Sequence, residues 1–163
     1  MPTLKWLHAA LIGLFACALI GWPAQRVEAC VEGLSWGMPL EQVRDHLGQS
    51  QPVDDEQPHR FVASHVLLDR LPVSSVTFDL DETNGLQSLA YEFAIDDMSE
   101  VLAGLRSRHG QPLSTSSEDQ DQSEQVWVWN TGEDLITAVK HQSAEQAKFL
   151  ISYRQSRLRP ETL

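Results

Sequence analysis

The sequence predicts an α+β domain of two successive α-β-β-β units, whose strands form one antiparallel sheet with two helices on one face. Three observations lead to this prediction. Two segments with apolar residues at helical spacing each end at a glycine, and each is followed by segments in which apolar and polar residues alternate. An Asn-Gly pair, a strong hairpin signal, stands between two of the alternating segments. We expect one domain over residues 30–155, with the first unit at 33–95 and the second at 96–155.

The first predicted helix begins after Pro39 and ends at Gly48. Proline suits the first helical turn because the N–H that it lacks has no partner there, and glycine is favoured just past the last turn. Leu40, Val43 and Leu47 recur at i, i+3 and i+7, so they share one face of the helix.

A polar loop over 49–58 leads to three predicted strands, at 60–68, 73–80 and 86–93. Apolar and polar residues alternate along the second and third of these strands, as they do in strands with one buried face. Asn84-Gly85 separates the same two strands, and both residues tolerate positive φ. The second and third strands are therefore predicted to form a hairpin.

The second predicted helix opens with a capping-box-like pair, Asp97 and Glu100, and ends at Gly110. Its apolar stripe consists of Met98, Val101, Leu102 and Leu105. An acidic loop over 114–124 follows. After it come three predicted strands, at 125–130, 134–140 and 148–154. Residues 156–163 are polar and are expected to form a flexible tail.

The first 29 residues have the features of an export signal. Residues 7–22 form an apolar run after Lys5, and Val27-Glu28-Ala29 places small residues at positions −3 and −1 of a cleavage site. The run is shorter than the ~20 apolar residues of a membrane-spanning helix. We therefore expect a periplasmic or secreted protein whose mature chain starts at Cys30.

Two cysteines leave a lipid-anchored alternative open. Leu14-Phe15-Ala16-Cys17 is similar to a lipoprotein signal, and Cys30 directly follows the expected cleavage point. A lipid on Cys17 or Cys30 would anchor the protein to the cell envelope. Neither cysteine has a cysteine partner within the predicted domain, so no internal disulfide is expected.

The charge balance narrows the class of partner. The chain has a net charge of −11, and because Lys5, Arg26 and Glu28 leave residues 1–29 at +1, residues 30–163 carry −12. A polyanion repels nucleic-acid phosphates and anionic lipid. We expect no nucleic-acid partner, and membrane contact only through the signal segment or a lipid anchor.

The sequence has no H-E-x-x-H or C-x-x-C spacing, no G-x-S-x-G elbow and no glycine-rich phosphate loop. Residues 79–85 are acidic, but their glycine comes one residue too late for a calcium loop, which favours a hairpin. We expect a non-enzymatic protein without catalytic residues, metal or cofactor. The alternative is a small periplasmic hydrolase or metal-handling protein that uses the acidic loops with His59 or His65.

Two features indicate protein binding. Trp127 and Trp129 share one face of a strand, where they serve either as core residues or as interface anchors. The two acidic loops occupy equivalent places in the two units and are expected to emerge from the same end of the sheet, where they would steer a basic partner. Their candidate binding residues are Asp54, Asp55, Asp119 and Asp121.

Residues 34–48 resemble the start of known bacterial exported domains. Two groups of proteins, the small lipoprotein of the outer-membrane β-barrel assembly complex and the tandem-repeat β-lactamase inhibitor protein, share the opening G-M-(S/T)-x-x-(Q/E)-V-x-x-x-L-G. It is similar to Leu34-Ser35-Trp36-Gly37-Met38-Pro39-Leu40-Glu41-Gln42-Val43, followed by Leu47-Gly48. The resemblance implies helix-plus-three-strand domains that act by protein–protein contact. It therefore implies a protein-binding or envelope assembly-accessory role, with another envelope protein as partner.

Overall fold

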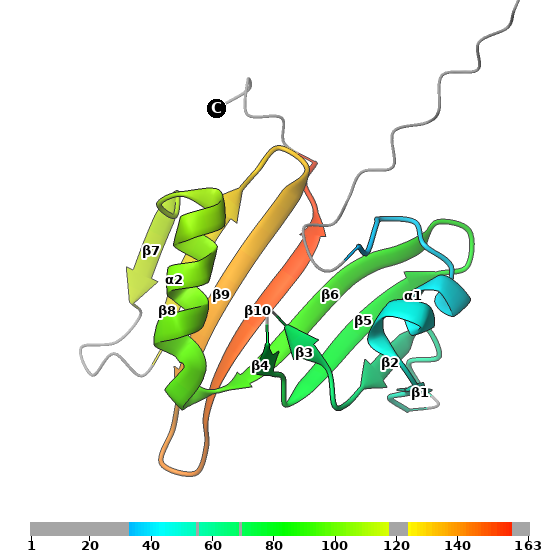
Figure 1. The fold of residues 1–163 in the computed structure, drawn as a ribbon, viewed down its shortest axis with the longest axis horizontal. Coiled ribbons are helices and arrows are strands. Elements are labelled where there is room, and N and C mark those ends of the chain that lie inside the picture. The colour runs from blue at the N-terminus through cyan, green and yellow to red at the C-terminus, as the bar shows by residue number, and fades with distance from the viewer. Residues whose placement is uncertain (1–32, 55, 69, 118–123, 158–163) are drawn as a thin grey trace, which may run out of the picture.

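Figure 1 shows the fold as a computed structural model, which describes residues 33–54, 56–68, 70–117 and 124–157. The predicted signal segment, with Cys17 and Cys30, lies outside these residues, as does the chain from residue 158 onward. The helical elements are α1 (Leu40–Leu47), the 3-10 turn η1 (Ile95–Asp97) and α2 (Met98–His109). The strands are β1 (Ser50–Pro52), β2 (Arg60–Ala63), β3 (Leu67–Leu68), β4 (Leu71–Pro72), β5 (Ser75–Asp81), β6 (Gly85–Ala94), β7 (Ser114–Ser117), β8 (Glu124–Asn130), β9 (Asp134–Gln142) and β10 (Ala147–Gln155).

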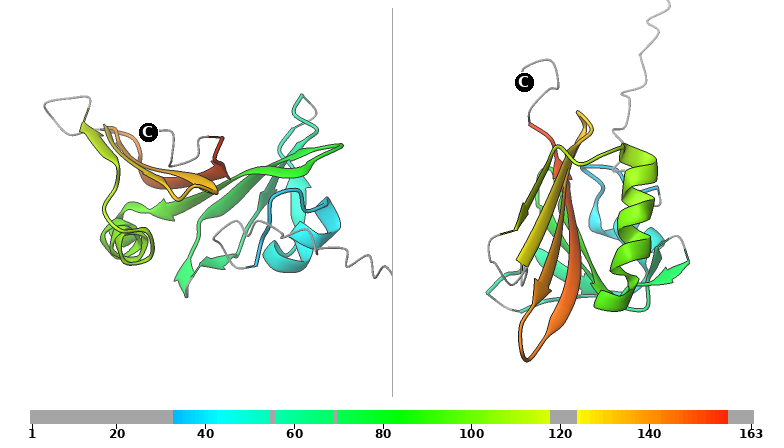
Figure 2. Two further views of the ribbon diagram at one scale, coloured as in Figure 1. Left: turned by 90° about the horizontal axis from the view of Figure 1, so that it is seen from above. Right: turned by 90° about the vertical axis from the view of Figure 1, so that its left-hand side faces the viewer.

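One large antiparallel sheet organises the described chain, and its strand order is β1-β2-β5-β6-β10-β9-β8-β7. Strands from the first half of the chain therefore occupy one side of the sheet, and strands from the second half occupy the other. The two sides meet where β6 pairs with β10. Both helices lie on one face of this sheet (Figure 2). The predicted α+β class with a large antiparallel sheet and two helices is confirmed.

The prediction of three strands after each helix is wrong, because each half adds a short fourth strand to the large sheet and the first half also forms the separate β3–β4 hairpin. β1 pairs with β2, and β7 pairs with β8, at the two edges of the sheet. Both added strands are polar and lack alternating apolar residues, so they lie within segments predicted as loops. Their pairing partners, rather than any local pattern, make them strands.

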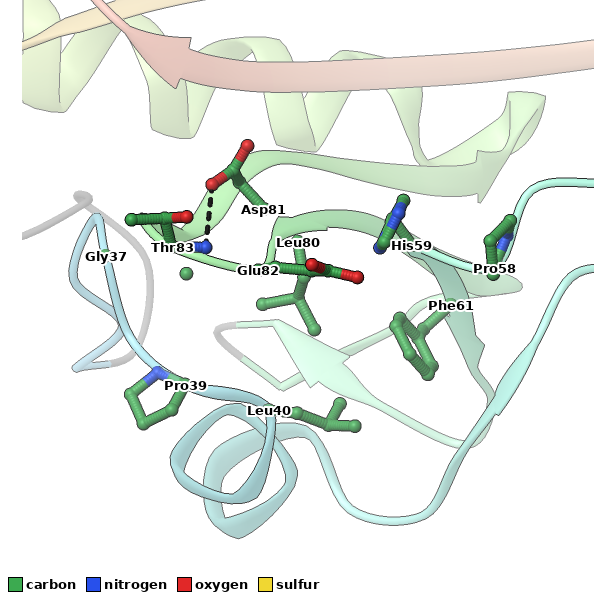
Figure 3. A pocket seen from close by; sticks show the side chains of 11 residues that line it. Gly37, Pro39, Leu40, Pro58, His59, Phe61, Leu80, Asp81, Glu82 and Thr83 are labelled. Carbon is green, nitrogen blue, oxygen red and sulfur yellow. Dashed lines mark hydrogen bonds between the residues drawn. The ribbon is translucent and has the colours of Figure 1, made fainter.

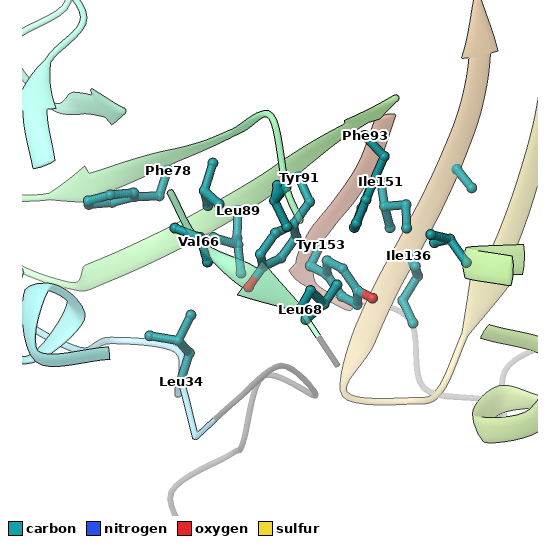
Figure 4. Packing of buried hydrophobic residues seen from close by; sticks show 14 of the residues in the cluster. Leu34, Val66, Leu68, Phe78, Leu89, Tyr91, Phe93, Ile136, Ile151 and Tyr153 are labelled. Carbon is teal, nitrogen blue, oxygen red and sulfur yellow. The ribbon is translucent and has the colours of Figure 1, made fainter. Parts of the chain in front are cut away.

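The strand predicted over 60–68 is also interrupted. β2 ends at Ala63, and His65 adopts a positive φ of 63°, which breaks the extended conformation. β3 then pairs with β4 in a separate two-stranded hairpin. Val66 and Leu68 are buried there, so this hairpin adds to the core on the helix side of the sheet (Figure 4).

The helix ends are partly as predicted. Gly48 follows α1 with φ 81° and Gly110 follows α2 with φ 76°, a conformation that glycine adopts without steric cost. The predicted capping box is wrong. Asp97 is itself helical and makes no side-chain cap hydrogen bond, because η1 leads directly into α2.

The core lies between the sheet and the two helices. Tyr91 and Tyr153 meet edge to face with their ring centroids 6.1 Å apart, and they join the two sides of the sheet beneath the helices (Figure 4). The helices bury most of their predicted apolar stripes, while Leu40 and Met98, the first residue of each stripe, are only partly buried. The buried residues are Val43 and Leu47 of α1 and Val101, Leu102 and Leu105 of α2. Within the described residues, no helix combines the length and the apolar character needed to cross a bilayer.

The segment before α1 pairs with the start of β6. The Gly37 N–H donates to the Leu86 carbonyl at 3.0 Å, and the Leu86 N–H donates to the Met38 carbonyl at 2.9 Å. Gly85 has φ 65°, and a Cβ added there would lie 2.3 Å from the Gly37 carbonyl oxygen. The predicted Asn84-Gly85 hairpin is therefore present, and its glycine also allows this close approach of two backbones.

Candidate functional site

Trp127 and Trp129 lie in the core, with 7% and 2% of their surface exposed. The Trp129 indole N–H donates to the Gly110 carbonyl at 3.0 Å, which joins β8 to the end of α2. Trp127 meets Phe149 edge to face, with ring centroids 6.2 Å apart. Of the two roles that the sequence leaves open, the pair therefore serves as core, and neither ring is available to a docking partner.

The two acidic loops lie at opposite ends of the sheet, and the prediction that they emerge together is wrong. The strand that follows the first loop begins at Arg60, in register with Asp79, Ser88 and Arg154. The strand that follows the second loop begins at Glu124, which lies at the other end of the sheet. Because β6 and β10 pair antiparallel, each strand of the second half runs opposite to the corresponding strand of the first half.

Of the four acidic candidate residues, the structure describes Asp54. The Asp54 Oδ1 accepts a hydrogen bond from the Gln57 N–H at 2.6 Å, so this carboxylate stabilises its own exposed turn. Asp55, Asp119 and Asp121 lie outside the described residues.

The histidines are spread over the molecule. His59 lies in the turn directly before β2, and His65 lies in the exposed bend that follows β2. His109 is half-buried at the end of α2, where burial lowers its pKa and the neighbouring Arg108 adds to the effect. Within the described chain, no three His, Cys, Asp or Glu side chains come together as metal ligands would.

A hollow of about 320 Å³ lies between α1 and the β5–β6 turn (Figure 3). Leu40, Phe61 and Leu80 supply apolar walls, and Asp81 lies on the rim. The Asp81 Oδ1 accepts hydrogen bonds from the backbone N–H groups of Asn84 and Thr83, each at 2.9 Å. These bonds hold the pKa of Asp81 below its usual value, so its carboxylate serves the turn as a charged cap.

The larger candidate surface is the sheet face that points away from α1 and α2, which we call the open face. Its residues alternate along each strand with the buried residues that face the helices. The loop between β1 and β2 and the strand β7 rise on this side, while both helices lie on the other (Figure 2, left). Strand register arranges the open face in rows, with one residue from each strand.

The central row of the open face carries no charged side chain. It consists of Val62, Thr77, Ala90, Ser152, Thr137 and Val128. All six residues are half-buried although both helices lie on the opposite face, because they are short and neighbouring rows shield them. The adjacent row carries Glu92 on β6 and adds three half-buried aliphatic side chains, Leu150, Val139 and Val126. A small and largely apolar surface is therefore presented outward.

The charged residues of the open face lie in the rows on either side of the central row, mostly in pairs. Arg60 donates to both carboxylate oxygens of Asp79, at 2.7 and 3.1 Å, and the Ser88 hydroxyl donates to Asp79 at 2.6 Å. The hydrogen bond from Arg60 is the main reason that the pKa of Asp79 lies below its usual value. On the other side of the central row, Lys148 lies 3.9 Å from Glu92.

A sheet with both helices on one face is expected to leave its other face open to a protein partner, and the sequence also carries a signal for the residues of that open face. Ser88, Ala90 and Glu92 alternate with Leu89, Tyr91 and Phe93, and the small residues recur at the paired positions of the neighbouring strands. The alternation shows which residues share a face, but it does not show which face the helices cover.

Comparison with known proteins gives one distant likeness. No family model matches the chain, and no curated protein matches it. Among solved structures, it is similar to a DUF4309 family protein (YjgB) from Bacillus subtilis subsp. subtilis str. 168, with 11% identity and a TM-score of 0.47 over 72% of this chain and 78% of that chain. At this distance the likeness carries no argument about function. The resemblance of residues 34–48 to assembly and inhibitor proteins stays a prediction.

Proposed function

We propose that the protein is an exported, non-enzymatic binding domain of the cell envelope, and that its open face docks another protein. The observation that carries the proposal is the uncharged central row, Val62 to Val128, on a chain with a net charge of −11. A sheet face meant only for water usually carries long polar and charged side chains. Depletion of charge at the centre of a surface is instead typical of protein interfaces.

The partner that fits is a different protein whose contact surface is uncharged at its centre. A second copy of this chain fits poorly, because two chains of net charge −11 repel each other as they approach. A partner with positive charge around its contact surface would be attracted by the acidic loops at the two ends of the sheet. Export, which the first 29 residues predict, would place that partner in the cell envelope.

A charge placed in the central row tests the proposal. A photo-crosslinking residue at Thr137 samples the open face, and the same residue at Ala103, which is exposed on α2, samples the helix side. We expect a discrete adduct with one envelope protein from position 137 in the native host, and none of the same mass from position 103. Ala90→Glu, introduced into the variant that carries the cross-linker at position 137, should abolish that adduct. The new carboxylate would be buried at the interface without a partner.

Ala103→Glu is the matched control, because it adds the same carboxylate to an exposed position on α2 and should leave the adduct unchanged. Thermal unfolding of both Glu variants should show that each is folded. The proposal would be wrong if Ala90→Glu left the adduct intact. It would also be wrong if the adduct proved to be a dimer of this chain.

A further inference from the structure

A second hollow, of about 460 Å³, lies on the open face beside the central row. Ser88, Leu135 and Arg154 line it from β6, β9 and β10, and Arg157 lines it from the segment after β10. No carboxylate is among the residues that line the hollow. It is thus a basic site on a strongly acidic chain.

The two arginines of this hollow are available to a ligand. Arg154 is in register with Ser88, which is in register with Asp79, but Asp79 is already bound by Arg60 and by the Ser88 hydroxyl. Arg154 and Arg157 are exposed, and neither makes an ion pair with another described residue. Arg60 and Arg154 therefore lie in the same row with opposite roles, one neutralised within the sheet and one directed to solvent.

We propose that this hollow binds a carboxylate group of the protein that docks on the open face. The inference rests on the proposed function and adds the chemistry of one contact. A guanidinium group presents two parallel N–H donors that match the two oxygens of a carboxylate. Leu135, half-buried between Arg154 and Asn130 in the same row, gives the apolar carbons next to such a carboxylate a surface to contact.

The charge of the chain favours a carboxylate over a phosphate group. Both anions match the guanidinium fork, but a phosphate dianion meets roughly twice the long-range repulsion from a chain of net charge −11. A carboxylate, with a single negative charge, makes the same local contacts with Arg154 and Arg157 but is repelled less by the rest of the chain. The carboxylate has two sources in a protein, an acidic side chain or the chain terminus, and the experiment separates them.

Three acetylated tripeptides of sequence Gly-X-Gly serve as probes, titrated into the isotope-labelled protein and followed by NMR. The first has Glu as X and an amidated end, the second has Gln and a free terminal carboxylate, and the third has Gln and an amidated end. We expect saturable shifts at the backbone amides of Ser88, Leu135 and Arg154 with the first or second peptide, and none with the third. Which of the two binds identifies the source of the carboxylate.

Arg154→Gln should weaken binding by about tenfold, the effect of losing a charge-assisted hydrogen bond. Arg106→Gln, an exposed arginine of α2, is the matched control and should leave binding unchanged. Equal binding of the uncharged peptide, an unaffected Arg154→Gln variant, or tighter binding of inorganic phosphate than of either carboxylate would overturn the proposal. If no carboxylate binds while Ala90→Glu still abolishes the cross-link at position 137, only the carboxylate site is wrong and the docking face stands.

Discussion

The Trp36 indole N–H donates a hydrogen bond of 2.8 Å to Oδ1 of Asp134, a fully buried carboxylate 98 residues further along the chain. The Asp134 backbone N–H also donates to the Thr131 hydroxyl at 2.9 Å, and its carbonyl accepts from the Thr131 N–H at 3.0 Å. One residue thus holds both the β8–β9 turn and the segment that leads into α1. Because a buried charge is costly without partners, this contact joins the two halves of the fold at a sensitive point.

Trp36→Phe should lower the free energy of unfolding by about 1–3 kcal/mol, because it removes one donor from a buried carboxylate. A double-mutant cycle with Asp134→Ala, which removes the acceptor, isolates the contribution of the pair when measured by urea unfolding. We expect the two changes together to cost less than the sum of the single changes. Strict additivity would show that the hydrogen bond does not contribute to stability.

Asp79 should make the protein sensitive to acid. Its pKa is lower in the folded state, mainly through the hydrogen bond from Arg60, so the stabilisation is present above the unfolded pKa of about 3.9. It is lost as the pH falls through the folded value. Urea midpoints measured from neutral to acid pH should fall less steeply in Asp79→Asn than in the wild type, while Asp96→Asn, at an exposed site before α2, should follow the wild type.

Gly85→Ala should destabilise the protein far more than Gly48→Ala. Both glycines have positive φ, 65° and 81°, so each alanine costs about 1–3 kcal/mol of backbone strain. Only at Gly85 would the added Cβ also meet backbone, 2.3 Å from the Gly37 carbonyl oxygen, whereas nothing lies within 4 Å at Gly48. Equal unfolding midpoints for the two variants would contradict the close pairing of the Gly37 segment with β6.

Leu102→Ala and Val43→Ala should each lower the free energy of unfolding by about 1–4 kcal/mol, because both side chains are buried between a helix and the sheet. Gln42→Ala, at an exposed position of α1, should change it by less than about 0.5 kcal/mol. Denaturant titrations of the three variants provide the comparison. Unchanged midpoints for the two core variants would mean that the helices dock differently.

The mature protein should begin at Cys30, since the apolar run and the Val27–Ala29 site predict cleavage there. Intact-mass measurement of the protein purified from the envelope of its native host gives the answer directly. Retention of residues 1–29, or a diacylglycerol mass on Cys17 or Cys30, would contradict an unmodified exported form.

The elements with local signals were predictable from the sequence. Pro39 and Gly48 bound α1, Gly110 ends α2, and the Asn84-Gly85 turn joins β5 to β6. The edge strands β1 and β7 were not predictable, because β2 and β8 impose the extended conformation on polar residues.

The candidate site was harder to predict from the sequence, because its charge and its apolar character depend on which strands pair. Among the described residues Arg154 has no carboxylate partner, because Asp79 is bound by Arg60, an arrangement across four strands that no local pattern encodes. The small size of Ala90 and Thr137 is visible in the sequence. Their position opposite the helices depends on the docking of α1 and α2, which tertiary packing decides.

The pairing of β6 with β10 also has a consequence for how the protein is made. β10 is the last of the described strands, so β6 has no partner on that side until every other described strand has been made. Until then residues 88–94 of β6 present unpaired backbone groups on that side, next to the apolar side chains of Leu89, Tyr91 and Phe93. A chain whose synthesis has not yet reached β10 therefore exposes an edge strand that favours aggregation, and productive folding depends on shielding that strand.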